Sequence, residues 1–185
     1  STLPHINKIK MIDTAYDEQT SPMPQKKETP STKLNRWWSL LSRFPAGRWI
    51  FSKLLGVMVP YTGSIKCTVV QFEPGYAEVL LQDRWRVRNH LRSVHAIALA
   101  NLGELATGLS LISGLSPHIR AILTGLDVRY TKKARGPLLA EATCTVPEVF
   151  SEVDHAIEAT IRDSYGDTVA VVTAHWLLDR TPEQT

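Results

Sequence analysis

The residue most suggestive of chemistry is Glu104, a single carboxylate in the most apolar segment of the chain, residues 95–112. A carboxylate among Leu, Ala and Gly must be paired, protonated or used in a reaction. Burial disfavours its charged form, so the pKa is raised toward the range of a general base near neutral pH. Gly103 and Gly108 flank it and predict close approach of a ligand or another backbone. The alternative is a structural role, with Glu104 bonded to nearby backbone or to Asn101.

A second group of polar residues precedes this segment, in the stretch Asn89-His-Leu-Arg-Ser-Val-His. Asn89 offers an amide donor, Ser93 is the predicted N-cap of the following helix, and His95 lies in its first turn. Backbone N–H groups at a helix start lack intrahelical partners and sit at the positive end of the helix dipole. Such a place can stabilise an oxyanion. The alternative is that His95 is only a surface or capping residue.

The hydrophobic pattern predicts the elements that must position these residues. Alternating apolar runs predict strands, and Pro74-Gly75 predicts a hairpin between the first two. The segment around Glu104 has a helical pattern that ends near Gly114. The predicted strands are 65–72, 76–81, 119–130, 138–146, 152–164 and 168–178.

The predicted helix is apolar on nearly every face, so it must be buried on most sides. A single antiparallel sheet of about six strands that curls around the helix satisfies this requirement. The edges of such a sheet, and its other face, need cover that commonly comes from a second copy. The pattern alone therefore predicts an α+β domain with a central buried helix, assembled as a dimer.

The amino-terminal part divides by composition. Residues 1–32 are rich in Pro, Ser and Thr, which predicts an arm or flexible tail, or an arm that docks on another subunit. Residues 33–60 contain no acid, and their apolar spacing predicts two amphipathic helices separated by Pro45-Ala46-Gly47. The stretch 33–58 is a candidate peripheral membrane contact. Alternatively, these helices pack on their own sheet or at a subunit interface. The predicted regions are 1–32, 33–60, a main domain at 61–180, and a tail at 181–185.

The composition excludes several classes of protein. The chain has 185 residues, of which 43% are hydrophobic and 21% charged, as in an ordinary globular domain. A net charge of +3 is too small to indicate a nucleic-acid partner. Cys67 and Cys144 predict reduced thiols in a cytoplasmic protein, and no apolar run reaches the roughly 18 residues of a membrane span. Without a signal-peptide pattern, zinc-type spacing, phosphate loop or nucleophile elbow, no metal or other cofactor is predicted.

The spacing of Asn89, His95-Ala96-Ile97 and Glu104 resembles hotdog-fold acyl-CoA thioesterases of the phenylacetyl-CoA thioesterase type. The segment 128–142 is similar to the strand, loop and strand that follow the helix in that family. The phrases at 59–64 and 88–96 more closely resemble a bacterial hotdog branch of unknown function. The resemblance covers roughly residues 50–180. It implies a sheet wrapped around the helix and active sites at a dimer interface, with Asn and His from one protomer and the acid from the other.

The resemblance also implies roles for these residues. Glu104 would activate water or attack a thioester carbonyl directly, and Asn89 would orient the water or the carbonyl. The N–H groups of Ala96 and Ile97, with His95, would hold the carbonyl oxygen. The chain departs from the family where His-Gly-Gly is common and His95-Ala96-Ile97 stands here, and in having Glu where Asp is more frequent. The implied function is acyl thioester hydrolysis; the alternative is a non-catalytic protein that binds acyl-CoA or an acyl chain.

Basic residues flank the predicted site. They would suit the phosphates of coenzyme A or the acidic surface of an acyl carrier protein, and the assembly would be a homodimer or a dimer of dimers. In an extended segment Arg84, Arg86 and Arg88 would share one face. The alternative is a solvated charged edge that discourages strand pairing. The candidate cations are Arg84, Arg86, Arg88, Arg92, Lys132, Lys133 and Arg135.

Overall fold

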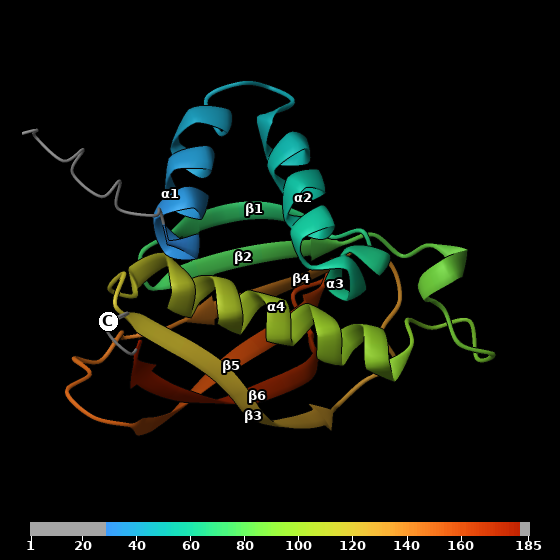
Figure 1. Ribbon diagram of the computed structural model, residues 1–185. Coiled ribbons are helices and arrows are strands. Elements are labelled where there is room, and N and C mark those ends of the chain that lie inside the picture. Colours follow the sequence, from blue (N-terminus) through green and yellow to red (C-terminus); the bar gives the residue numbers. More distant parts are fainter. Residues whose placement is uncertain (1–28, 182–185) are drawn as a thin grey trace, which may run out of the picture.

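A six-stranded antiparallel sheet curls around one long helix in the structure, a computed structural model that describes residues 29–181 (Figure 1). The helices are α1 (Pro30–Leu41), α2 (Gly47–Met58), α3 (Pro60–Ser64) and α4 (Ala96–Gly114), with a short 3-10 helix η1 at Trp85–Val87. The strands are β1 (Thr68–Glu73), β2 (Tyr76–Leu81), β3 (Ile119–Tyr130), β4 (Leu138–Thr143), β5 (Val153–Asp163) and β6 (Thr168–Arg180). Their order in the sheet is β1-β2-β4-β5-β6-β3. The predicted order of two strands, a helix and four strands is confirmed.

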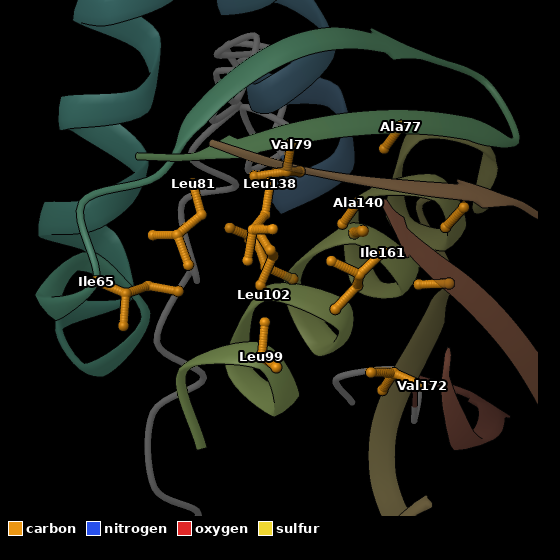
Figure 2. Packing of buried hydrophobic residues seen from close by; sticks show 14 of the residues in the cluster. Ile65, Ala77, Val79, Leu81, Leu99, Leu102, Leu138, Ala140, Ile161 and Val172 are labelled. Carbon is orange, nitrogen blue, oxygen red and sulfur yellow. The ribbon is translucent and has the colours of Figure 1, made fainter. Parts of the chain in front are cut away.

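The core lies between α4 and the concave face of the sheet. Figure 2 shows Leu99 and Leu102 of α4 packed toward Val79, Leu138 and Ile161 of the strands. By length and composition α4 could cross a membrane, but 72% of its most apolar window is buried inside the fold. This burial explains why the helix is apolar on nearly all sides, as the pattern required.

Gly103 allows α4 to approach the sheet closely. A Cβ at this position would lie 2.4 Å from Cβ and Cγ2 of Val172 on β6, far inside van der Waals contact. The sequence predicted close approach at this glycine, and the approaching group is the sheet of the same chain.

The two amino-terminal helices cover the edge of the sheet at β1. The hydroxyl of Ser52 on α2 accepts a hydrogen bond from the backbone N–H of Val69 at 2.8 Å. This N–H would have no acceptor if the edge of the sheet were open. Trp38, Phe51 and Phe72 form an aromatic cluster between α1, α2 and β1, with ring centroids 5.1–6.0 Å apart. The inner faces of α1 and α2 therefore pack on their own sheet.

Two boundaries in the amino-terminal half of the chain differ from the prediction. The helix α1 begins at Pro30, inside the predicted arm, because the Thr29 side chain caps it. The rest of that arm, residues 1–28, and the tail residues 182–185 lie outside the described residues. Strand β1 begins at Thr68 instead of residue 65, because the unpredicted α3 runs to Ser64 and the chain then turns with Lys66 at φ 48°.

The opposite edge of the sheet is β3, which pairs only with β6 among the described residues. Ile122 is 49% exposed and Tyr130 is 47% exposed, and Leu123 and Leu126 are also exposed. A long strand with apolar side chains and unpaired backbone groups favours pairing with another chain.

Candidate functional site

A cavity of about 1010 Å³ opens at the amino-terminal end of α4. Helix α3, η1, the loop that follows it and the first two turns of α4 form its walls. The structure thus brings together Asn89, His95 and Ile97, which the sequence singled out. The lining residues are Tyr61, Ser64, Ile65, Trp85, Arg86, Val87, Arg88, Asn89, Arg92, His95, Ile97, Ala98 and Asn101.

His95 is the N-cap of α4. Its Nδ1 accepts the backbone N–H of Ile97 at 3.1 Å, and its own N–H donates to the carbonyl of Val87 at 2.8 Å. Because Nδ1 acts as an acceptor, the neutral ring carries its proton on Nε2, which can donate to a bound molecule. The predicted cap at Ser93 was wrong: Ser93 is buried and its hydroxyl donates to Asn89 Oδ1 at 3.1 Å.

Asn89 holds the loop that precedes α4. Its Oδ1 accepts hydrogen bonds from the N–H of Leu91 at 2.9 Å and from both the N–H and the hydroxyl of Ser93. The carbonyl end of this side chain is therefore fully used, while among the described residues the NH₂ group has no acceptor. This division favours Asn89 as a donor to a carbonyl oxygen.

The start of α4 keeps unused backbone donors. Among the described residues, no acceptor is bonded to the N–H of Ala96 or of Ala98, whereas the Ile97 N–H is taken by the His95 cap. Tyr130 at the end of β3 donates its hydroxyl to the Ala96 carbonyl at 3.0 Å, which fastens this turn to the sheet. The oxyanion position predicted at Ala96 and Ile97 thus has one free N–H and one already bonded.

Glu104 lies one turn beyond the cavity and is partly buried. Burial raises the pKa of its carboxyl group above the ordinary value of 4.5. Within residues 29–181 this carboxylate makes no hydrogen bond or ion pair, so the alternative in which it bonds to backbone or to Asn101 does not hold there. A Cβ on Gly108 would lie 4.0 Å from Glu104 Oε1 and 3.4 Å from the Trp176 ring, so this glycine leaves room beside the carboxylate.

One chain does not bring Glu104 to His95. Nine residues separate them, which is two and a half helical turns and about 13 Å of rise. Glu104 is also not among the residues that line the cavity. However, Ile97, Asn101 and Glu104 are spaced four and three residues apart and share one face of α4. Glu104 therefore lies on a face that continues from the cavity wall along the helix.

The seven candidate cations are divided by the structure. Arg86, Arg88 and Arg92 line the cavity, and Arg88 is held by an ion pair of 2.6 Å with Asp83. The expectation that Arg84, Arg86 and Arg88 share an extended face was wrong, because the chain forms η1 at Trp85–Val87.

The other candidate cations do not line this cavity. Arg84 donates to the carbonyls of Ile65 and Lys66, and so fixes the connection after α3. Lys132 bridges Asp163 at 2.8 Å and Asp167 at 2.5 Å, and these hydrogen bonds raise its pKa to about 12. Lys133 and Arg135 are exposed and are not among the residues that line the cavity.

Residues 47–178 match a protein family described as Domain of unknown function (DUF4442). The chain belongs to this family. No curated protein matches this DUF4442 protein by sequence. The crystal structure of a genomics target, APC5556, is similar, with 28% identity, a TM-score of 0.70, and coverage of 80% of this chain and 99% of that chain.

Two solved structures of lower identity share the fold. A Pseudomonas aeruginosa protein of unknown function, described as a probable thioesterase, has 20% identity and a TM-score of 0.65, with 70% of this chain and 93% of that chain covered. A thioesterase from Haemophilus influenzae has 13% identity and a TM-score of 0.59, with 67% and 85% covered. The predicted hotdog fold of this DUF4442 protein is confirmed.

Asn101 and helix α3 are site features that the sequence reasoning missed. Asn101 lines the cavity and lies on the same helix face as Glu104. Its position three residues before Glu104 was a signal, since it is the only amide in a helix of Ala, Leu and Gly. For α3 the signal was Pro60, which is favourable at the first position of a helix.

Proposed function

We propose that this protein hydrolyses an acyl thioester at a site shared between two copies of the chain. The observation that carries the proposal is Glu104: a carboxylate on the core helix, without a partner within residues 29–181 and with its pKa raised by burial. A carboxylate so placed is a better base than an exposed one near neutral pH. The cavity with Asn89 and His95 supplies the complementary donors.

The reaction needs only water as a co-reactant. The Glu104 carboxylate takes a proton from water while the water oxygen bonds to the thioester carbonyl carbon. The Ala96 N–H, the Asn89 NH₂ and the His95 Nε2–H stabilise the resulting oxyanion. When the carbon–sulfur bond breaks, the thiolate takes the proton from Glu104, which leaves a carboxylic acid and a thiol. In the other route Glu104 attacks the carbonyl carbon itself and expels the thiolate. Water then hydrolyses the mixed anhydride, which restores the Glu104 carboxylate, releases the carboxylic acid and supplies the proton that the thiolate takes up.

In this proposal a second copy of the chain brings its Glu104 close to His95 of the first copy. Pairing of two β3 strands would bury Ile122 and Tyr130 and would continue the sheet from one protomer into the other. Because α4 contacts β3, such a dimer sets the two α4 helices side by side. Glu104 of the partner subunit would then face His95, in a homodimer or in a dimer of dimers.

The cavity cations fit a charged carrier of the acyl group. Arg86 and Arg92 are exposed at the cavity, and Arg88 is oriented by Asp83. They would bind the phosphates of coenzyme A or the acidic surface of an acyl carrier protein.

The test is thiol release from a panel of acyl-CoA substrates of different chain lengths. Glu104→Gln keeps the shape of the side chain but removes the base, so the rate should fall by about 10²–10⁴. The matched control is Glu158→Gln on the exposed face of β5, which should leave the rate unchanged. Unchanged hydrolysis in Glu104→Gln would remove Glu104 from the mechanism.

A second candidate function is binding of an acyl thioester without hydrolysis. It is favoured by one observation: the Ile97 N–H is already bonded to His95, and the Ile97 side chain is 54% exposed at the cavity. An oxyanion site with fewer free donors stabilises a tetrahedral intermediate less. Acyl-CoA binding in a titration calorimeter, without thiol release by the wild-type protein, would select this function.

A further inference from the structure

The outward side of α2 and α3 is an apolar surface with no cover among the described residues. Phe51 and Leu55 of α2 are buried against the sheet, while the opposite side of the same helix is exposed. Val57 is 78% exposed and Tyr61 is 70% exposed. We call this surface the α2–α3 face. It consists of Trp49, Ile50, Leu54, Val57, Met58, Val59 and Tyr61.

The chain segment that carries the α2–α3 face is basic. From residue 29 to residue 72 the chain contains no Asp or Glu. Arg48 and Lys53 are exposed on α2 itself, and the Lys53 ammonium lies 5.4 Å from the centre of the Trp49 ring. The cations of this stretch are Lys33, Arg36, Arg43, Arg48, Lys53 and Lys66. A partner for this face must therefore be both apolar and acidic.

A second copy of the chain does not meet that requirement. In a two-fold dimer each surface contacts the same surface of the other copy, so Arg48 and Lys53 would face Arg48 and Lys53. Juxtaposed like charges disfavour association, and this stretch has no acid to compensate them. The pairing of copies proposed through β3 lies at the other edge of the sheet.

We propose that the α2–α3 face docks on an anionic lipid bilayer. Aliphatic side chains enter the boundary between headgroups and acyl chains, while Trp and Tyr rings are favourable at that depth. Lysine and arginine beside them are attracted to anionic headgroups. Trp49, Val57 and Tyr61 supply the first group, and Arg48 and Lys53 supply the second. This inference does not depend on the proposed hydrolysis.

A protein that lies with the α2–α3 face on the bilayer would have two cavities beside the lipid. Helix α3 separates the cavity at the start of α4 from a smaller one of about 350 Å³ beside α2. Tyr61 and Ser64 line the first, and Thr62 and Gly63 line the second. Figure 1 shows α2 leading into α3 beside α4. A molecule that leaves the bilayer here would reach either cavity without crossing the rest of the protein.

The test is flotation of the full chain with vesicles. We expect binding to phosphatidylcholine vesicles that contain phosphatidylglycerol, weaker binding at high salt, and little binding to phosphatidylcholine alone. On anionic vesicles the fluorescence of the wild-type protein should shift to the blue as Trp49 leaves water. Wild-type protein that stays at the bottom of the gradient with anionic vesicles would overturn the proposal.

Variants then locate the contact. Val57→Asp and Tyr61→Asp change highly exposed side chains, so folding should be unaffected, and each should weaken vesicle binding about tenfold or more. The matched control is Phe150→Asp, which is 74% exposed beside the other end of α4 and should bind as the wild type does.

Two outcomes would contradict the membrane assignment. Equal loss of binding in Phe150→Asp would show nonspecific adhesion. If Val57→Asp changes the oligomeric mass instead of vesicle binding, the face is a contact between copies. Lys53→Glu offers an independent check, since it keeps the apolar surface and should weaken binding only to anionic vesicles.

Discussion

Mixing two inactive variants tests whether the site is shared between subunits. Glu104→Gln removes the base, and His95→Asn removes the Nε2 donor while keeping a good N-cap residue. A homodimer of either variant has one defect in each of its two sites. In a mixed dimer both defects fall in one site, and the other site combines His95 of one subunit with Glu104 of the other.

The expected recovery follows from this arrangement. Random reassociation gives about half mixed dimers with one intact site each, so about a quarter of the wild-type sites return. Each parent alone should keep about 1% or less of the wild-type rate if the lost group contributes the usual factor of at least about a hundred. Mixing should therefore raise thiol release about 25-fold above either parent.

The assay is thiol release from acyl-CoA before and after the two variants are unfolded and refolded together. Mixed dimers are counted by native mass spectrometry on chains of different tag length. As a control, His95→Asn is mixed with the double variant His95→Asn/Glu104→Gln, which should recover nothing because every site lacks His95. Mixed dimers without recovered activity would refute a site shared between chains.

Four further predictions concern the wild-type protein and three single variants. The kcat/KM of the wild type should fall as pH falls through the raised pKa of Glu104, at a higher pH than for an exposed glutamate, in an acyl-CoA hydrolysis profile. Because that raised pKa means that the folded state disfavours the carboxylate, Glu104→Gln should melt at a higher temperature than the wild type at neutral pH, and this gain should vanish in acid. Gly103→Ala should lower the free energy of unfolding: the added Cβ would lie 2.4 Å from Val172, and overpacking of about 1–3 kcal/mol outweighs the gain of about 1 kcal/mol in helix propensity. Ser52→Ala should destabilise by about 1 kcal/mol in urea unfolding, because it leaves the Val69 N–H without an acceptor.

The sequence predicted the sheet and the core helix because both are set by burial along the whole segment. Strands β2 and β3 were predicted at their observed bounds, 76–81 and 119–130. Helix α4 was predicted because a long segment of Ala, Leu and Gly can only be stable when wrapped. In each case many residues contribute to the same hydrophobic pattern, so the element is still predicted when one residue does not fit the pattern.

Local details decided by a few hydrogen bonds were predicted less well. Ser93 and His95 both can cap a helix, and the choice depends on Ser93 turning inward to Asn89. The helix α3 has only five residues, too few to show a period. The spacing of His95 and Glu104 on one helix already implies that they lie about 13 Å apart along the axis. It could not show which residues line the cavity, or that Glu104 is not one of them.

The polar residues of α4 fall into two groups, and folding alone explains only the first of them. Thr107, Ser110 and Ser113 lie on faces that the fold covers, and each hydroxyl donates to the carbonyl three residues before it. Asn101 and Glu104 share the face that continues from the cavity, and within residues 29–181 neither side chain makes a hydrogen bond. A helix selected only for its core would satisfy or remove these two groups, because an unbonded polar group at a partly buried site costs stability. In the proposed function the partner of these two groups on this face is a second chain, a bound thioester, or both.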